Sequence, residues 1–141
     1  MNGFLLDTNI PSELTRTRPE ARVVAWLESA DDEAMFFSVV SLGEIVKGVS
    51  LLDNGRKRDE LEKWLEATLC PWFGARILPV NEAIARYWGA LTAEFELKGR
   101  KIKVADGMIA AAAQVHNLTV VTRDVNDFAG LGAEIFNPWN P

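Results

Sequence analysis

The sequence predicts an α/β fold in which helices enclose a parallel sheet. Short apolar runs alternate with longer amphipathic stretches along the 141 residues. This alternation is the pattern of parallel strands that are connected by helices. No internal repeat, linker or low-complexity tract interrupts it. Because the length suits one domain, residues 1–141 are expected to form a single domain.

Four apolar runs are expected to be buried strands. They cover residues 4–6, 35–38, 76–80 and 118–121. The first run leads directly into Asp7-Thr8-Asn9, and the last leads into Thr122-Arg123-Asp124. Polar residues therefore come directly after the first and the last of the predicted strands.

The stretches between the strands have the apolar spacing of amphipathic helices. Helices are expected after Asn9 and over residues 20–29, 42–49, 61–69, 84–99 and 105–115. Pro11 suits the first turn of the earliest helix, with Asn9 as its cap. Asn117 is expected to end the last one.

Composition excludes several classes of protein. The chain is 48% hydrophobic and 25% charged, as in ordinary globular proteins. No basic segment precedes a long apolar run at the N-terminus, and no run reaches the roughly 18 apolar residues of a membrane span. A cytoplasmic protein without membrane contact is therefore expected. The single cysteine, Cys70, excludes an internal disulfide and is expected to be a small buried apolar residue.

Positive charge is local in this acidic chain. A net charge of −5 argues against a general nucleic-acid binder. However, four basic residues fall within six positions just before Asp106, namely Lys98, Arg100, Lys101 and Lys103. A second cluster is Arg56-Lys57-Arg58. The first cluster can hold a substrate backbone by its phosphates, and its alternative role is a solvated loop.

Four acidic residues are expected to meet at one edge of the sheet. They are Asp7, Glu44, Asp106 and Asp124. Asp7 ends the first predicted strand, and Asp124 follows the fourth. Glu44 lies on the helix after the second strand, and Asp106 opens the helix before the fourth. Ligands of open parallel sheets bind outside the carboxyl ends of the strands, so this edge is the expected site.

Gathered carboxylates imply a cation. Two like charges about 4 Å apart repel by roughly 4 kcal/mol at an effective dielectric constant near 20. Magnesium prefers oxygen ligands, and manganese is its usual substitute. A bound metal can activate water and stabilise charge on a phosphodiester.

Each acid also has a structural alternative. Asp7 can be a turn residue, and Asp106 can be a helix N-cap. Asp124, followed by Asp127, resembles the cap of a short final helix. Glu44 can pair with Lys47 on a solvated face.

The acids lie in segments whose joint order is specific. These segments are Phe4-Leu5-Leu6-Asp7-Thr8-Asn9, Ser41-Leu42-Gly43-Glu44-Ile45, Ala105-Asp106-Gly107-Met108-Ile109-Ala110-Ala111 and Leu118-Thr119-Val120-Val121-Thr122-Arg123-Asp124, followed by Asp127-Phe128 and Asn137-Pro138-Trp139. Over nearly the whole chain they resemble the PIN-domain family, and within it the VapC-type toxins of bacterial toxin–antitoxin pairs.

This resemblance implies an endoribonuclease that cuts single-stranded or loop RNA with Mg²⁺ or Mn²⁺. It also implies a PIN-like three-layer α/β/α sandwich around a mainly parallel sheet of about five strands. The expected partners are a second copy of the chain, a cognate antitoxin that covers the site and, only through the antitoxin, DNA.

The resemblance also implies a role for each site residue. Asp7 and Asp106 correspond to the principal metal ligands, and Glu44 and Asp124 complete the acidic quartet. The supporting positions are Thr8, Ser41, Thr122 and, in a secondary role, Asp127.

Two other functions fit the sequence less well, and a third stays open. A phosphoacceptor receiver domain usually has an acidic pair after its first strand, where this chain has only Asp7. A haloacid-dehalogenase-type phosphatase has a second aspartate two residues later, where this chain has Asn9. A catalytically silent module of the same fold, acting within an antitoxin–DNA repressor complex, remains the open alternative.

Overall fold

The sheet has five strands within residues 3–141, the part of the chain that this computed structural model describes. They are β1 (Phe4–Leu6), β2 (Met35–Ser38), β3 (Ile77–Leu78), β4 (Thr119–Val121) and β5 (Ile135–Phe136). Their order is β3-β2-β1-β4-β5, and every neighbouring pair is parallel. The predicted parallel sheet is confirmed. The expected absence of a secretory signal concerns the N-terminal segment. Met1 and Asn2, the first residues of that segment, lie outside the described residues.

Both faces of the sheet are buried. Successive residues of a strand point to opposite faces. Leu5 and Val120 accordingly pack into the core on one face, whereas Leu6, Phe37 and Val121 pack into the core on the other. All five side chains are fully buried. Continuous apolar strands of this kind are typical of a sheet that is covered on both sides.

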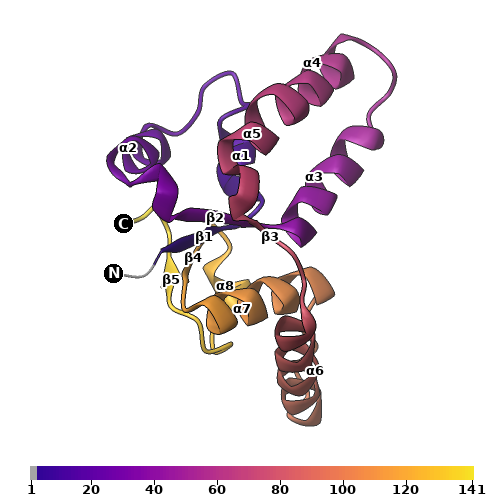
Figure 1. The fold of residues 1–141 in the computed structure, drawn as a ribbon, viewed down its shortest axis with the longest axis vertical. Coiled ribbons are helices and arrows are strands. Elements are labelled where there is room, and N and C mark those ends of the chain that lie inside the picture. Colours follow the sequence, from indigo (N-terminus) through magenta and orange to yellow (C-terminus); the bar gives the residue numbers. More distant parts are fainter. Residues whose placement is uncertain (1–2) are drawn as a thin grey trace.

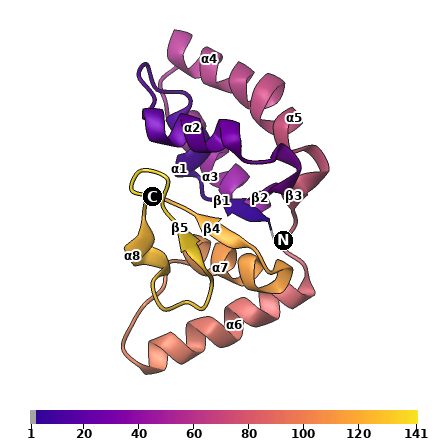
Figure 2. The same cartoon turned by 90° about the vertical axis from the view of Figure 1, so that its left-hand side faces the viewer.

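Helices cover the two faces in separate layers (Figures 1 and 2). One layer contains α1 (Asn9–Glu13), α2 (Ala21–Ser29), α3 (Val39–Ser50), α4 (Arg56–Trp64) and α5 (Cys70–Phe73). The other contains α6 (Glu82–Leu97), α7 (Val104–His116) and the short α8 (Val125–Phe128). This confirms the three-layer α/β/α sandwich. No helix in residues 3–141 is long and apolar enough to cross a membrane.

A wide π turn, Leu65–Leu69, connects α4 to α5. The Cys70 amide donates its hydrogen bond to the Leu65 carbonyl, five residues earlier. Pro71 follows, and a proline ring crowds the carbonyl four residues before it in a regular helix. The wider turn gives this ring room. It also places Leu65 and Leu69 in the core, directly after the partly exposed Trp64.

The position of α7 depends on the residue that ends it and on one close approach near its start. Its last turn ends at Asn117, whose φ of 56° is left-handed, which confirms the predicted end. Near its first turn, Gly107 faces Trp88 of α6, and a Cβ there would lie 2.9 Å from the indole Cδ1. Glycine therefore allows α7 to pack closely against α6.

Several details differ from the sequence predictions. β3 is shorter than residues 76–80 because Gly74–Arg76 form a 3₁₀ turn, in which Arg76 donates to the carbonyls of Met35 and Trp72 at 2.6 Å. A further 3₁₀ turn spans Asp32–Ala34. Periodicity did not locate β5, which is only two residues long.

Two single residues also depart from expectation. Val46 lies within the helix expected over residues 42–49, at the spacing of its apolar positions, yet it is 42% exposed. Cys70 is half-buried rather than buried, and its partial burial raises the pKa of the thiol. The expectation of a fully buried Cys70 was therefore wrong.

Phe37→Ala should lower the free energy of unfolding by about 3–5 kcal/mol. Phe37 is fully buried, and its ring stacks on that of Phe73 at 4.9 Å between centroids. The matched control is Leu97→Ala, which truncates a side chain that is 89% exposed and should change stability by less than about 0.5 kcal/mol. Urea denaturation of both variants measures the difference, and equal losses would contradict this account of the core.

Candidate active site

The four predicted acids line one cleft at the carboxyl edge of the sheet. Its volume is about 420 Å³. Its lining residues are Asp7, Thr8, Asn9, Ser12, Glu44, Lys103, Ala105, Asp106, Asp124 and Asp127. We call this hollow the acidic cleft. The four carboxylates come from the residue after β1, from α3, from α7 and from the segment after β4, so residues far apart in sequence meet here.

Asp7 is the fixed member of the group. It is 6% exposed, and its amide donates to the Val121 carbonyl at 2.9 Å. One carboxylate oxygen accepts the Thr8 amide at 2.8 Å, and the other accepts the Thr122 hydroxyl at 2.7 Å. Burial raises the pKa of Asp7, the two hydrogen bonds lower it, and the charges of Glu44 and Asp124 raise it further. The result is a raised pKa. Asp7 is therefore held in the turn by hydrogen bonds, as the structural alternative expects, and it also lines the acidic cleft.

Asn9 links two of the acids. Its side-chain Nδ2 donates to Asp124 Oδ2 at 3.1 Å and to Asp7 Oδ2 at 3.5 Å. Its Oδ1 accepts the Arg123 amide at 3.4 Å. The expectation that Asn9 caps α1 was wrong, because Thr8 occupies the cap position and Asn9 is the first helical residue. Its side chain is thereby free to bridge the cleft.

Thr122 and Thr8 hold the carboxylates from two sides. Besides donating to Asp7, the Thr122 hydroxyl accepts the amide of Asp124 at 3.0 Å. The Thr8 hydroxyl donates to Glu44 Oε1 at 2.8 Å. Ser41, the third polar position expected to support the site, is fully buried and does not line the cleft. Its hydroxyl has no hydrogen-bond partner among the described residues.

Glu44 and Asp124 are exposed members of the group. No ion pair joins Glu44 to Lys47 in the described part of the chain, so the alternative of a solvated pair does not hold. Asp124 occupies the cap position of α8, but its side chain makes no capping hydrogen bond. Both carboxylates are thus free to face the cleft.

The pKa of the Asp106 carboxyl group is strongly raised. Asp106 is the third residue of α7, whose cap position is Lys103, so the N-cap alternative was wrong. Its pKa is raised to about 6: burial is the largest cause, the charges of Asp127, Asp7 and Glu44 contribute, and Lys103 opposes them. Asp127 therefore belongs electrostatically to the cluster, as the secondary role assigned to it requires.

Only one residue of the basic segment reaches the acidic cleft, and it is Lys103. Lys98 pairs with Glu94 at 3.2 Å, and Lys101 is exposed. Arg100 donates to the carbonyl of Ala129 at 2.6 Å and lies over the Phe95 ring. Arg100 thus holds the segment after α8 in place.

The donor set of the acidic cleft fits a hard divalent cation. The acidic residues that line the cleft all offer carboxylate oxygens, which are the ligands that magnesium prefers. As placed, no three His, Cys, Asp or Glu side chains within residues 3–141 are close enough to hold one ion. Magnesium, however, keeps several of its waters and is commonly held by one or two carboxylates. The pKa values of Asp7 and Asp106 are raised because their ionised forms are disfavoured, and a bound cation would offset that cost.

The sequence analysis missed two polar residues of the cleft, Asn9 and Ser12, and the apolar Ala105. Asn9 directly follows Asp7-Thr8, but the sequence analysis interpreted it only as a helix cap. Its position two residues after a strand-ending aspartate was the available signal. Ser12 had no comparable signal, because only the turn of α1 brings it to the cleft.

Comparison with known proteins finds similar proteins over nearly the whole chain. The family model described as PIN domain matches residues 4–133. Toxin FitB of Neisseria gonorrhoeae is 43% identical, over 97% of this chain and 99% of that protein. VapC ribonuclease Y4jK of Sinorhizobium fredii is 34% identical, over 98% and 99%. A chain in the structure of FitAB bound to a DNA fragment is 41% identical with a TM-score of 0.89, covering 96% of this chain and 95% of that one.

Asp106→Asn should stabilise the metal-free protein by about 1 kcal/mol near neutral pH, a value discounted because the side chain is partly exposed. The folded state raises the pKa from 3.8 to about 6, so between these values it binds more protons than the unfolded state. Wild type consequently loses stability as the pH rises through this window. The gain of the variant should be complete above 6 and absent below 3.8.

Thermal unfolding in EDTA across this pH range measures the effect. The matched control is Asp53→Asn, which neutralises an exposed carboxylate outside the acidic cleft. A pH-independent gain, or the same gain in both variants, would contradict the electrostatic account of Asp106.

Proposed function

Because the chain belongs to the PIN-domain family and is of the VapC type, we propose that it is a metal-dependent endoribonuclease, the toxin of a toxin–antitoxin pair. The single observation that carries the proposal is the meeting of Asp7, Glu44, Asp106 and Asp124 in the acidic cleft. Relatives named as a toxin and as a ribonuclease match almost the entire chain, so the proposal rests on the whole domain rather than on one motif.

The four carboxylates would hold Mg²⁺, one or two of them directly and the others through its bound waters, with Mn²⁺ as its substitute. When bound, the metal would supply an activated water and charge stabilisation for a phosphodiester. Asp7 acts as the anchor, since both of its oxygens already accept hydrogen bonds. The more exposed Glu44, Asp106 and Asp124 are the carboxylates that can face substrate and solvent, and one of them accepts the proton of the attacking water.

The polar residues around the acids orient them. Thr122 holds Asp7 and the Asp124 amide, Thr8 holds Glu44, and Asn9 joins Asp7 to Asp124. Hydrogen-bonding partners of metal ligands fix the direction of the ligand oxygens. Ser41 lies buried in the first turn of α3, and Asp127 adds negative charge beside Asp106.

Substrate phosphates need positive charge close to these acids. Lys103 lines the acidic cleft and is the proposed phosphate contact there. Lys98 and Lys101 extend the positive charge away from the cleft. Arg100 keeps the segment in place through the Ala129 carbonyl. Together these four residues form the proposed basic border of the site.

The proposed partners follow from the family. A cognate antitoxin would cover the site, and the chain would pair with a second copy. The FitAB relative was solved bound to a DNA fragment, which supports contact with DNA through the antitoxin. We place the activity in the cytoplasm, where RNA and such a complex are both present. A catalytically silent module would share these partners but would cut no RNA.

Asp7→Asn should lower RNA cleavage by about 100-fold or more, because it removes the anchor charge of the metal site. The measurement uses a mixed pool of structured and single-stranded RNA with Mg²⁺, with Mn²⁺ or with EDTA. Asp53→Asn is the matched control and should cut as wild type does. Cleavage in EDTA, or unchanged cleavage by Asp7→Asn, would refute the site. No cleavage by folded, metal-loaded wild type would favour the silent module.

Asn9→Ala should lower cleavage by about 10- to 100-fold, the usual loss when a hydrogen-bond partner of a metal ligand is removed. The amide does not contact the metal directly in this proposal, so raising the Mn²⁺ concentration should restore part of the activity. A metal titration of the cleavage rate measures this shift. A loss that no metal concentration relieves would contradict the positioning role of Asn9.

A further inference from the structure

A groove leads away from the acidic cleft toward α4. Its near part has a volume of about 360 Å³ and shares Thr8, Ser12 and Glu44 with the acidic cleft. Its far part has a volume of about 550 Å³. The two parts have four lining residues in common, namely Thr15, Lys57, Leu61 and Trp64. The three hollows therefore adjoin one another in sequence, and we call the near and far parts together the Trp64 groove.

We propose that the Trp64 groove binds the RNA strand beside the phosphodiester that is cut, with one base stacked on Trp64 and one phosphate contacting Lys57. This inference rests on the proposed function, because it assigns a path to the substrate of the acidic cleft. A strand whose phosphodiester lies at the four carboxylates has to leave the cleft, and this groove opens directly from it.

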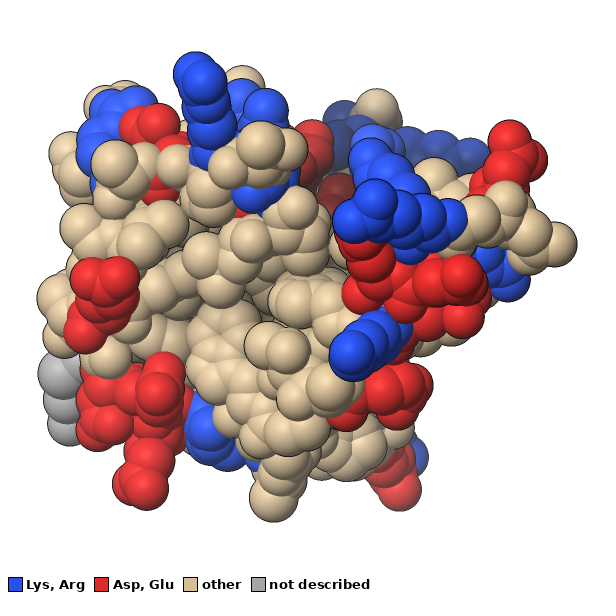
Figure 3. All heavy atoms as spheres, turned by 90° about the horizontal axis from the view of Figure 1, so that it is seen from above, with Lys and Arg blue, Asp and Glu red and all other residues tan. Residues whose placement is uncertain are grey.

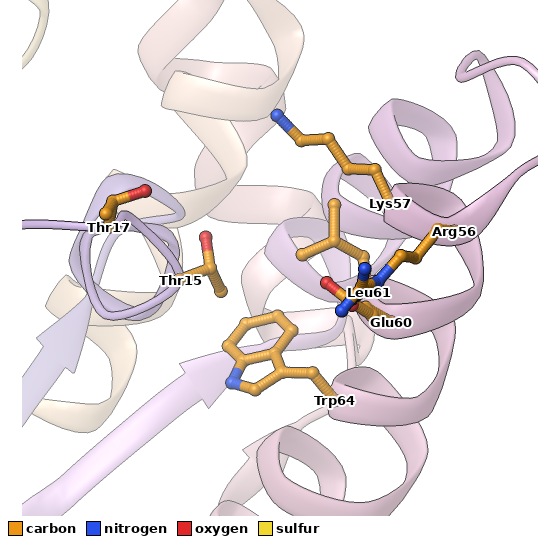
Figure 4. Close-up of a pocket in the computed structure, with 7 residues that line it drawn as sticks. All are labelled: Thr15, Thr17, Arg56, Lys57, Glu60, Leu61 and Trp64. Carbon is orange, nitrogen blue, oxygen red and sulfur yellow. Dashed lines mark hydrogen bonds and ion pairs between the residues drawn. The ribbon is translucent and has the colours of Figure 1, made fainter.

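Trp64 presents its indole to the groove. It ends α4, immediately before the π turn that turns Leu65 and Leu69 into the core. Figure 4 shows the indole below Thr15 and Leu61, at the bottom of the far part in that view. Stacking of a base on an aromatic side chain contributes strongly to the binding of single-stranded nucleic acids and tolerates any sequence. π turns are also frequent at functional sites.

Lys57 supplies the positive charge. It lines both parts of the groove, and no acidic side chain among residues 3–141 forms an ion pair with it. Its neighbour Arg56 is instead paired with Glu60 at 2.9 Å. On the face seen in Figure 3, charged side chains of both signs lie mainly around the edge, and the middle is largely uncharged. A single free cation in a groove has a large local effect on a polyanion.

The opposite wall of the groove is a preformed loop. Glu13 is 5% exposed and accepts the Glu20 amide at 2.8 Å, which closes the loop that carries Thr15 and Thr17. The Thr15 hydroxyl donates to the Ser12 carbonyl at 2.7 Å. Figure 4 places both threonine side chains across from α4. Their hydroxyls are suited to the ribose and phosphate oxygens of a strand.

These features favour a polynucleotide over a peptide. An apolar groove alone would suit either occupant. The groove, however, adjoins a cleft proposed to act on phosphodiesters, and it combines a partly exposed aromatic side chain with an unpaired cation and hydroxyl groups. This is the combination that binds unpaired bases together with their backbone.

The test measures binding of a fluorescein-labelled, mixed-sequence pool of single-stranded RNA with Mg²⁺ present. Every protein carries Asp7→Asn, so that the probe stays intact. Trp64→Leu keeps an apolar side chain and removes the aromatic face, whereas Trp64→Phe keeps a smaller face. Lys57→Gln removes the charge, and Lys63→Gln is its matched control on the same helix, outside the groove. Thermal unfolding checks that each variant is folded.

We expect Trp64→Leu to weaken binding by about 5- to 150-fold and Trp64→Phe to weaken it less. Lys57→Gln should reduce the slope of log affinity against log salt concentration by about 0.7, and Lys63→Gln should leave that slope unchanged. Because Lys57 is exposed, its variant tests the groove even if Trp64→Leu fails to fold.

Wild-type binding by a folded Trp64→Leu protein, or an unchanged salt slope for Lys57→Gln, would overturn the proposal. So would a Trp64→Leu protein that binds the RNA pool normally but has lost affinity for its antitoxin, since the groove would then be a peptide site. Cleavage of the same pool by the chain with Asp7 intact is measured in parallel. Cleavage without any effect of Trp64 or Lys57 refutes only the groove, whereas no cleavage at all refutes the proposed function.

Discussion

The hydrogen bond from the Thr122 hydroxyl to Asp7, 2.7 Å long, is the contact on which the arrangement of the site depends. It joins the residue that follows β4 to the residue that follows β1. Parallel pairing of these two central strands brings their carboxyl ends to the same edge of the sheet. Thr122 also accepts the Asp124 amide. One buried hydroxyl thereby couples the register of the sheet to the spacing of two acids.

This arrangement places negative charge where the fold does not favour it. Burial raises the pKa of both Asp7 and Asp106, and neighbouring carboxylates add to the effect. A fold keeps such groups together only if the surrounding packing is strong enough, and here the fully buried strands and α7 provide that packing. A cation would relieve the repulsion. Stability and metal binding are therefore linked in this cleft, because the same carboxylates take part in both.

The two sides of the acidic cleft have different chemical character. On one side, Lys103 begins α7, and Arg100 anchors the preceding segment to the chain after α8. On the other side, the Trp64 groove offers an aromatic face and the free Lys57 amine. The chain is acidic overall, so these local features rather than its net charge would govern contact with a polyanion.

The sequence by itself determined the α/β class, most of the helices and strands, and the list of acids, because hydrophobic periodicity and strand-ending aspartates are local signals. Only the tertiary structure decided how they meet. It converted Asn9 from an expected cap into a bridge between Asp7 and Asp124, and it separated Lys103 from the rest of its basic run. It also located β5 and the Trp64 groove. These features depend on contacts between distant segments, and the spacing of residues along one segment does not encode such contacts.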